Sequence, residues 1–283
     1  MPDVPPETFH KDTFKGLNCK IIIPLESSKK YDDDVSIEGD QADDGFWCGI
    51  PLTTQTIGVK FNDDNNIING NQLSECITKS GISESLIKSI IIENGILENL
   101  PDFVSTLNSL SSLEDVTITN LARFKDPLTQ KIFSGLTISS IEIDVEIESI
   151  PIECFKDCTN LRKAYINNCQ AAEDSCFSGC VNLQEVVLNV GELNGDNHFK
   201  GCISLETVSL RKLLSVSSYS EHIFTDCHLT SIYLNPSGPP STFHKNTFSG
   251  KNVIIQGLTN DELKTYDANT NVEGDVANDK TWC

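Results

Sequence analysis

The sequence predicts an α/β solenoid, with a ladder of parallel strands on one face and short helices or turns on the other. Three observations lead to this prediction. A Phe recurs in steps of 22 to 25 residues, a fixed apolar pattern follows each Phe, and 13 of the 20 aromatic residues are Phe. Because one such short unit cannot bury its apolar side alone, repeated units are expected to stack as coils.

Each coil contains a predicted short strand. The segment FKDCTNLRKAYI places Leu161, Ala164 and Ile166 in the pattern L-x-x-I-x-L, which ends in apolar–polar alternation. Such alternation is typical of a strand with one buried face. The earlier segments LSSLEDVTI and LIKSIII fit the same frame without a Phe phrase. Strands from successive coils are therefore expected to pair in parallel, about 4.7–4.9 Å apart.

The Phe residues and the Cys residues that follow three positions later are predicted to form an internal spine. Burying each benzyl group contributes roughly 1.5–3 kcal/mol. A Cys fixed at a repeat position is most simply a small buried hydrophobic residue. Disulfides between coils in an oxidising environment are an alternative, and the C-x₃-C spacing differs from the C-x₂-C spacing of structural zinc sites. The spine consists of Phe133, Phe155, Phe177, Phe199, Phe224, Phe248, Cys158, Cys180, Cys202 and Cys227.

Side chains that alternate with the buried strand positions are expected to point outward and to form a continuous strand face. Two Tyr and two aliphatic residues on such a ladder suit a protein-binding surface, because Tyr is enriched at interfaces. The strand propensity of Tyr, Val, Ile and Thr explains the same residues without any partner. The predicted face comprises Ile91, Thr117, Glu142, Lys163, Tyr165, Val187, Asn189, Ser209, Arg211 and Tyr233.

The two ends of the chain carry a duplication. Residues 5–16 read PPETFHKDTFKG and residues 239–250 read PPSTFHKNTFSG, and both copies continue to an EGD and a final Trp-Cys pair. Residues 1–48 are therefore predicted to be the terminal element of a preceding tandem unit, duplicating 239–283. Residues 49–283 are predicted to form one solenoid, with 49–85 as N-terminal cap, 86–235 as repeats and 236–283 as C-terminal cap element.

Charge and motifs exclude several function classes. A net charge of −20 argues against nucleic acid as a partner, because a phosphate backbone needs a basic face. The chain has no apolar stretch of about 20 residues, so no membrane insertion is expected, and MPDVPPETFHKD lacks the features of a signal peptide. The acidic run at 31–45 lacks the spacing of a calcium loop. No catalytic motif is present, so we expect no enzyme activity, no cofactor and no metal site.

The phrase F-x-x-C-x-x-L-x-x-I-x-L, with an apolar residue five positions before the Phe, resembles BspA-type leucine-rich repeat proteins. The resemblance covers about 86–283, with 1–48 as a separate terminal element. It implies an α/β leucine-rich repeat solenoid and a protein-binding role in a microbial adhesion or host-interaction protein. It also implies a cell-surface or extracellular location. An intracellular scaffold and a passive spacer in a long repeat protein are the alternatives, and the cytoplasm is the alternative location because no signal peptide is visible.

Overall fold

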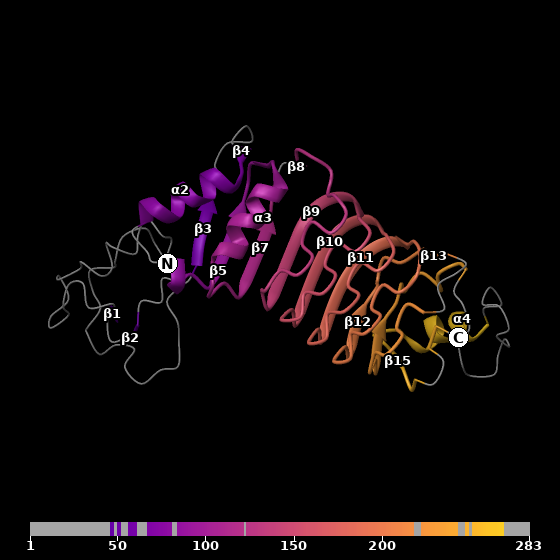
Figure 1. Cartoon of the computed structure of the whole chain (residues 1–283). Coiled ribbons are helices and arrows are strands. Elements are labelled where there is room, and N and C mark those ends of the chain that lie inside the picture. The colour runs from indigo at the N-terminus through magenta and orange to yellow at the C-terminus, as the bar shows by residue number, and fades with distance from the viewer. Residues whose placement is uncertain are drawn as a thin grey trace.

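The computed structural model confirms the predicted solenoid: successive coils stack side by side, and their strands line one face (Figure 1). The structure describes residues 46–47, 50–51, 56–60, 67–80, 84–121, 123–217, 222–242, 247–248 and 251–268. The predicted tandem element at 1–48 lies almost entirely outside these residues, as do Cys48 and Cys283.

The main sheet is a parallel ladder in the order β15-β14-β12-β11-β10-β9-β7-β5-β3, with β13 paired to β11. Its strands follow one another in chain order, as expected for coils that each add one rung. The strands are β3 (Thr56–Lys60), β5 (Ser89–Glu93), β7 (Asp115–Thr119), β9 (Ser140–Ile150), β10 (Lys163–Ala172), β11 (Glu185–Leu193), β12 (Thr207–Ser209), β13 (Ser215–Val216), β14 (Ser231–Tyr233) and β15 (Ile254–Gln256).

The ladder extends beyond 86–235, the segment predicted to hold the repeats. Strand β3 lies within the predicted N-terminal cap, and β15 lies within the predicted C-terminal cap element. Helix α4 (Asn260–Asp267) follows β15 and begins with a capping box between Thr259 and Glu262. Its Tyr266 is buried, and the Tyr266 hydroxyl donates to the carbonyl oxygens of Asn235 at 2.8 Å and Gly238 at 3.1 Å. The phenol thereby fixes α4 to the loop that follows β14.

The N-terminal coils carry helices opposite the strands, as Figure 1 shows. The helices are α2 (Gly70–Ser80), α3 (Leu100–Ser109) and a single 3₁₀ turn, η1 (Glu84–Leu86). A second parallel sheet joins these coils and consists of β4 (Ile67–Ile68), β6 (Ile96–Leu97) and β8 (Arg123–Phe124). A short antiparallel pair, β1 (Phe46–Trp47) and β2 (Ile50–Pro51), precedes β3.

From Phe133 onward, the described coils carry tight turns in place of helices, up to α4. The structure places the six spine Phe residues in one column. Neighbouring ring centroids are 4.9–5.6 Å apart with interplanar angles of 2–17°, and each Phe side chain is at most 8% exposed. Stacked rings at these distances add attraction beyond their burial.

The position two residues after five of the six spine Phe residues adopts positive φ, which explains why either Gly or Asp stands there. The angles at Gly135, Asp157, Gly179, Gly201 and Asp226 are 59–80°. Gly reaches this region without steric cost, and Asp is one of the few other residues that enters it readily. The first four of these residues each donate their backbone N–H to a carbonyl in the next coil. The turns are thus tied together as a second ladder.

The Cys column is joined to the Phe column by hydrogen bonds. The thiol of Cys158 donates to the carbonyl of Phe133 at 3.0 Å, and Cys180, Cys202 and Cys227 repeat this contact with the Phe one coil earlier at 3.0–3.1 Å. All four Cys side chains are buried. Burial raises the pKa of the Cys227 thiol to about 12, so this thiol stays protonated at neutral pH and remains a donor.

Candidate binding surfaces

The predicted strand face contains one continuous row of residues held in register. Each of the seven middle residues faces the corresponding residue of the next strand, in the order Ile91, Thr117, Glu142, Tyr165, Val187, Ser209 and Tyr233. The row continues to Gly58 in β3 and to Gln256 in β15. The flanking residues Lys163, Asn189 and Arg211 lie beside this row, on β10 and β11 and directly after β12.

The structure does not place all ten predicted face residues equally at the surface. Lys163 and Arg211 are exposed, whereas most of the row is half-buried. Ser209 is only 8% exposed, contrary to the expectation that it points freely outward. Its short side chain lies in the row between Val187 and Tyr233, and these larger neighbours cover it. Ser209 therefore offers little surface to a partner.

Tyr165 is held in place by its neighbours on β10 and β11. Its hydroxyl donates to Glu185 Oε2 at 3.2 Å, and the same carboxylate oxygen lies 3.6 Å from Lys163 Nζ. Burial raises the pKa of Tyr165, and the carboxylate of Glu185 raises it further. The phenol is therefore neutral at physiological pH and serves as a fixed donor.

A second ordered cluster lies nearer the C-terminal end of the face. The Arg211 guanidinium carbon lies 4.8 Å from the centroid of the Tyr233 ring, within the range of a cation–π interaction. In the neighbouring coils, Asn189 Nδ2 donates to Asn167 Oδ1 at 2.7 Å. Side chains already restrained in this way lose less conformational entropy when a partner binds.

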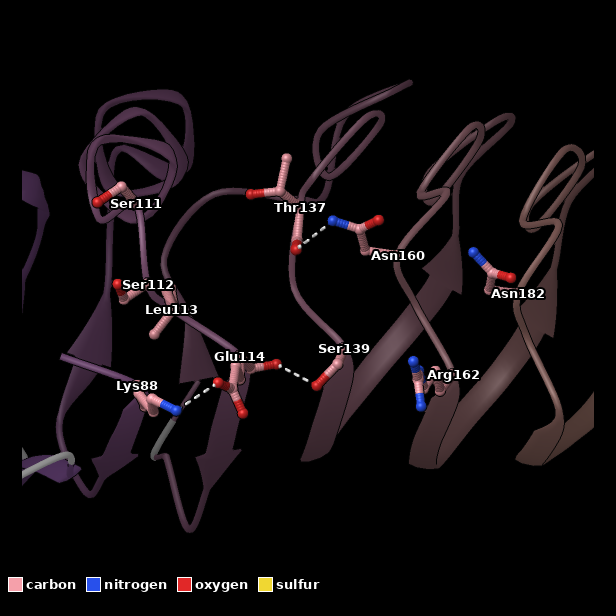
Figure 2. A pocket seen from close by; sticks show the side chains of 10 residues that line it. All are labelled: Lys88, Ser111, Ser112, Leu113, Glu114, Thr137, Ser139, Asn160, Arg162 and Asn182. Carbon is pink, nitrogen blue, oxygen red and sulfur yellow. Dashed lines mark hydrogen bonds and ion pairs between the residues drawn. The ribbon is translucent and has the colours of Figure 1, made fainter. Parts of the chain in front are cut away.

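A polar groove of about 610 Å³ crosses the loops that precede β5, β7, β9, β10 and β11 (Figure 2). Asn160 Nδ2 donates to the Thr137 carbonyl at 3.2 Å, and Lys88 Nζ lies 2.9 Å from Glu114 Oε1. Ser139 Oγ also donates to the backbone carbonyl of Glu114. The groove was not predicted from the sequence. The signal that the sequence offers for it is the polar residues on both sides of the first apolar position of each repeat. It is lined by Lys88, Ser111, Ser112, Leu113, Glu114, Thr137, Ser139, Asn160, Arg162 and Asn182.

A second groove of about 660 Å³ is lined by the second halves of β9, β10 and β11 and by two residues of a later loop, Lys212 and Leu214. The register of β10 shifts here relative to both neighbours, between Asn167 and Cys169 against β9. Asn168 in the shift has a φ of 57°. Glu148, Glu173 and Glu192 line the groove together with Leu214, whose side chain is 64% exposed.

Among the described residues, His198 is the one buried His. His198 is fully buried in the column immediately before the Phe spine, and its Nδ1 lies 3.4 Å from Cys176 Sγ. Burial lowers its pKa to about 4, despite the opposing attraction of Asp174 and Asp196. Its Nε2 has no hydrogen-bond partner among the described residues. No cluster of three or more His, Cys, Asp or Glu side chains in the described ranges could hold a metal ion.

A family model described as "BspA type Leucine rich repeat region" matches residues 83–194 and 189–270, in six copies. These ranges span most of the chain. The chain belongs to the BspA-type leucine-rich repeat family. No curated protein and no solved structure matches it. The matched repeats of this BspA-type chain extend from the η1 turn to just beyond α4 and include the whole described Phe column, whereas β3 precedes them.

The helices in the described part of this BspA-type chain are too short or too polar to cross a membrane. Of its described Cys residues, those at 154, 158, 169, 176, 180, 202 and 227 are free thiols. Six of these occupy the two Cys-containing columns of the repeat at 154, 158, 176, 180, 202 and 227, and all six are buried. Packing therefore accounts for them.

Proposed function

We propose that this chain is a non-catalytic protein-binding module whose partner contacts the strand face. Leucine-rich repeats commonly serve as protein-binding modules, and the family assignment supports that general role. The observation that carries the proposal is the in-register row that presents Tyr165 and Tyr233 on one parallel ladder. Tyr and Arg are the residues that most often dominate binding energy at protein interfaces.

The order within the face supports its choice over the polar groove. Arg211 over Tyr233, and Tyr165 bonded to Glu185, are two aromatic anchors already held in one geometry. In the groove, the Asn160 and Asn182 amides donate to carbonyls of the preceding coil. These amides fasten coils together, so fewer polar groups remain for a partner.

We further propose a microbial cell-surface role in adhesion or host interaction, because BspA-type repeat proteins are typically surface-associated. A second candidate is an intracellular scaffold that uses the same face. Disulfides persist mainly in oxidising compartments, so the redox state of the thiols bears on this choice. Titrating the thiols of freshly isolated protein distinguishes the two. Disulfide-bonded protein supports the surface role, and fully reduced protein supports the scaffold.

The binding face is tested by removing both aromatic anchors. Affinity-purified full-length chain is incubated with extracellular-matrix and cytosolic extracts, and retained proteins are identified by mass spectrometry. Tyr165→Ala plus Tyr233→Ala should weaken binding of the retained partner by at least about tenfold, since hot-spot truncations typically cost about 2 kcal/mol or more. The dissociation constant of the purified pair gives the measurement.

A matched double variant serves as the control. Ile152 and Ile203 are exposed at 43% and 49% in the turns away from the strand face, so Ile152→Ala plus Ile203→Ala should leave binding unchanged. If the two double variants bind equally well, the strand face is not the binding site. In that case the partner contacts another surface of the unit, whereas a failure to retain any protein would support the passive spacer.

A further inference from the structure

The described part of the strand ladder ends at β15 on one side and at β3 on the other. Among the described residues, β15 pairs only with β14, and at the other end β3 pairs only with β5. The backbone N–H of Ile254 donates to the Thr230 carbonyl at 2.9 Å. Because N–H groups alternate in direction along a strand, the N–H of Ile255 points away from β14. An unpaired edge of this kind is a template for another strand.

The two edges are complementary in direction and register. Thr56 in β3 and Ile254 in β15 hold the same register position. Each strand between them has a residue at this position, and each pairs with the one on the next strand. A second copy placed after β15 would therefore bring Thr56 opposite Ile254 and Gly58 opposite Gln256. Ile254 is 61% exposed, so apolar surface on the last strand is still available for burial. Such a contact joins two different ends and is head-to-tail.

The duplicated terminal element precedes a β3 strand in the sequence. Residues 5–48 duplicate 239–283, and the Trp47-Cys48 pair that ends the first copy lies only eight residues before Thr56. The chain thus already contains the order terminal element, then β3. An identical arrangement after Cys283 would bring β3 of a further unit close to β15.

We propose that the β15 end of the ladder is a joint for a second copy of this unit, whose β3 pairs in parallel with β15 and continues the sheet. In this arrangement Ile255 N–H donates to the Thr56 carbonyl of the following copy, and Thr56 N–H of that copy donates to the Val253 carbonyl. The joint is independent of the protein-binding face, since it uses main-chain groups at the edges of the sheet.

The test uses a tandem chain in which residues 49–283 follow directly after Cys283 of the full-length chain. Each unit is then preceded by a terminal element, as in the natural sequence. Hydrogen exchange of the peptide 251–258 is followed by mass spectrometry in the single and tandem chains. The single chain should give one population, in which the Ile255 amide exchanges fast. The tandem chain should give two, since only its first β15 is covered, and exchange in the covered copy should slow by at least about tenfold.

The control is Thr56→Pro in the second copy alone. The alternation of the backbone directs the Ile57 N–H towards β5 and the Thr56 N–H towards the open edge, so Pro removes a donor of the joint and leaves the β3–β5 pairing intact. The slow population should disappear while circular dichroism stays unchanged.

Slow exchange of the Ile255 amide in the single chain would overturn the joint, because another segment would then cover β15. A single fast population in the tandem chain, or protection that survives Thr56→Pro, would overturn it equally. If Thr56→Pro unfolds the second copy, small-angle scattering of the unsubstituted tandem chain decides. One stiff rod supports the joint, and two bodies that move independently contradict it.

Discussion

The N-terminal coils and the Phe coils build the same ladder but close their outer side in different ways. In the N-terminal coils, residues paired across neighbouring strands are 33 and 26 positions apart in the sequence, from Thr56 to Ser89 to Asp115. Helices α2 and α3 cover the core there. Around β10 to β12 the spacing is 22 residues, from Lys163 to Glu185 to Thr207, and turns with stacked rings cover it. The outer segments vary while the strand register is kept.

This difference shows where each region obtains its packing. Helix α3 buries Leu100, Phe103, Val104 and Leu107 along one side, as an amphipathic helix does. Each Phe coil buries one ring, and four of the six also bury a thiol three positions after the Phe. Their turn N–H groups donate to carbonyls of the next coil. The stability of a Phe coil therefore depends more directly on its neighbouring coils.

The largest expected effect is the loss of a central ring. Phe177 stacks on Phe155 at 4.9 Å and on Phe199 at 5.6 Å, whereas no described ring stacks on the equally buried Phe103. Phe177→Ala and Phe103→Ala should each destabilise by about 3–5 kcal/mol, with Phe177→Ala the larger, since aromatic contacts add about 0.5–1.5 kcal/mol. Urea unfolding gives both values. A larger loss of unfolding free energy for Phe103→Ala would contradict the added contribution of ring stacking in the Phe coils.

The second effect is a pH dependence specific to the Phe coils. The pKa of His198 is about 4 in the folded chain and about 6.5 when unfolded, so the unfolded state binds the proton first as the pH falls. Stability is therefore fully present above about pH 6.5 and declines towards pH 4, by up to about 3 kcal/mol. His198→Gln should flatten this part of the unfolding free-energy curve. An unchanged slope would mean that His198 is not buried in its neutral form.

The smallest effect compares two glycines. A Cβ on Gly70 in α2 would lie 2.6 Å from the Asp102 carbonyl oxygen in α3, whereas a Cβ on Gly135 would meet nothing within 4 Å. Gly70→Ala should therefore cost about 1–3 kcal/mol by forcing the helices apart. Gly135→Ala carries only the strain of its φ of 71°, about 1–2 kcal/mol. Thermal unfolding of both variants measures the difference, and a greater loss at Gly135 would show that helix contact is not the tighter constraint.

Periodicity made much of the fold predictable. The recurring Phe and the L-x-x-I-x-L pattern are sufficient to place Leu161, Ala164 and Ile166 inside and Tyr165 in the outward row, because strand alternation leaves no other arrangement. Six repeats of one phrase also predict that the rings fall in one column. The pattern cannot give the burial of Ser209, which depends on the size of its neighbours on two other strands.

Other features depend on geometry that the pattern does not encode. Strand β3 lies 33 residues before the next rung, so its membership of the ladder has no periodic signal. Strand β9 continues to Ile150 although the register against β10 shifts at Asn168, which has a left-handed backbone. Both grooves combine side chains from several coils, so they arise only once the coils are stacked.

The central claim is that neighbouring Phe coils stabilise one another through their stacked rings. A double-mutant cycle with Phe155→Ala and Phe177→Ala measures this contact directly, with Phe103→Ala and Phe177→Ala as the distant control pair. The account predicts a coupling free energy of about 0.5–1.5 kcal/mol for the stacked pair and a value near zero for the control. Equal coupling in both pairs, or none in the first, would contradict it.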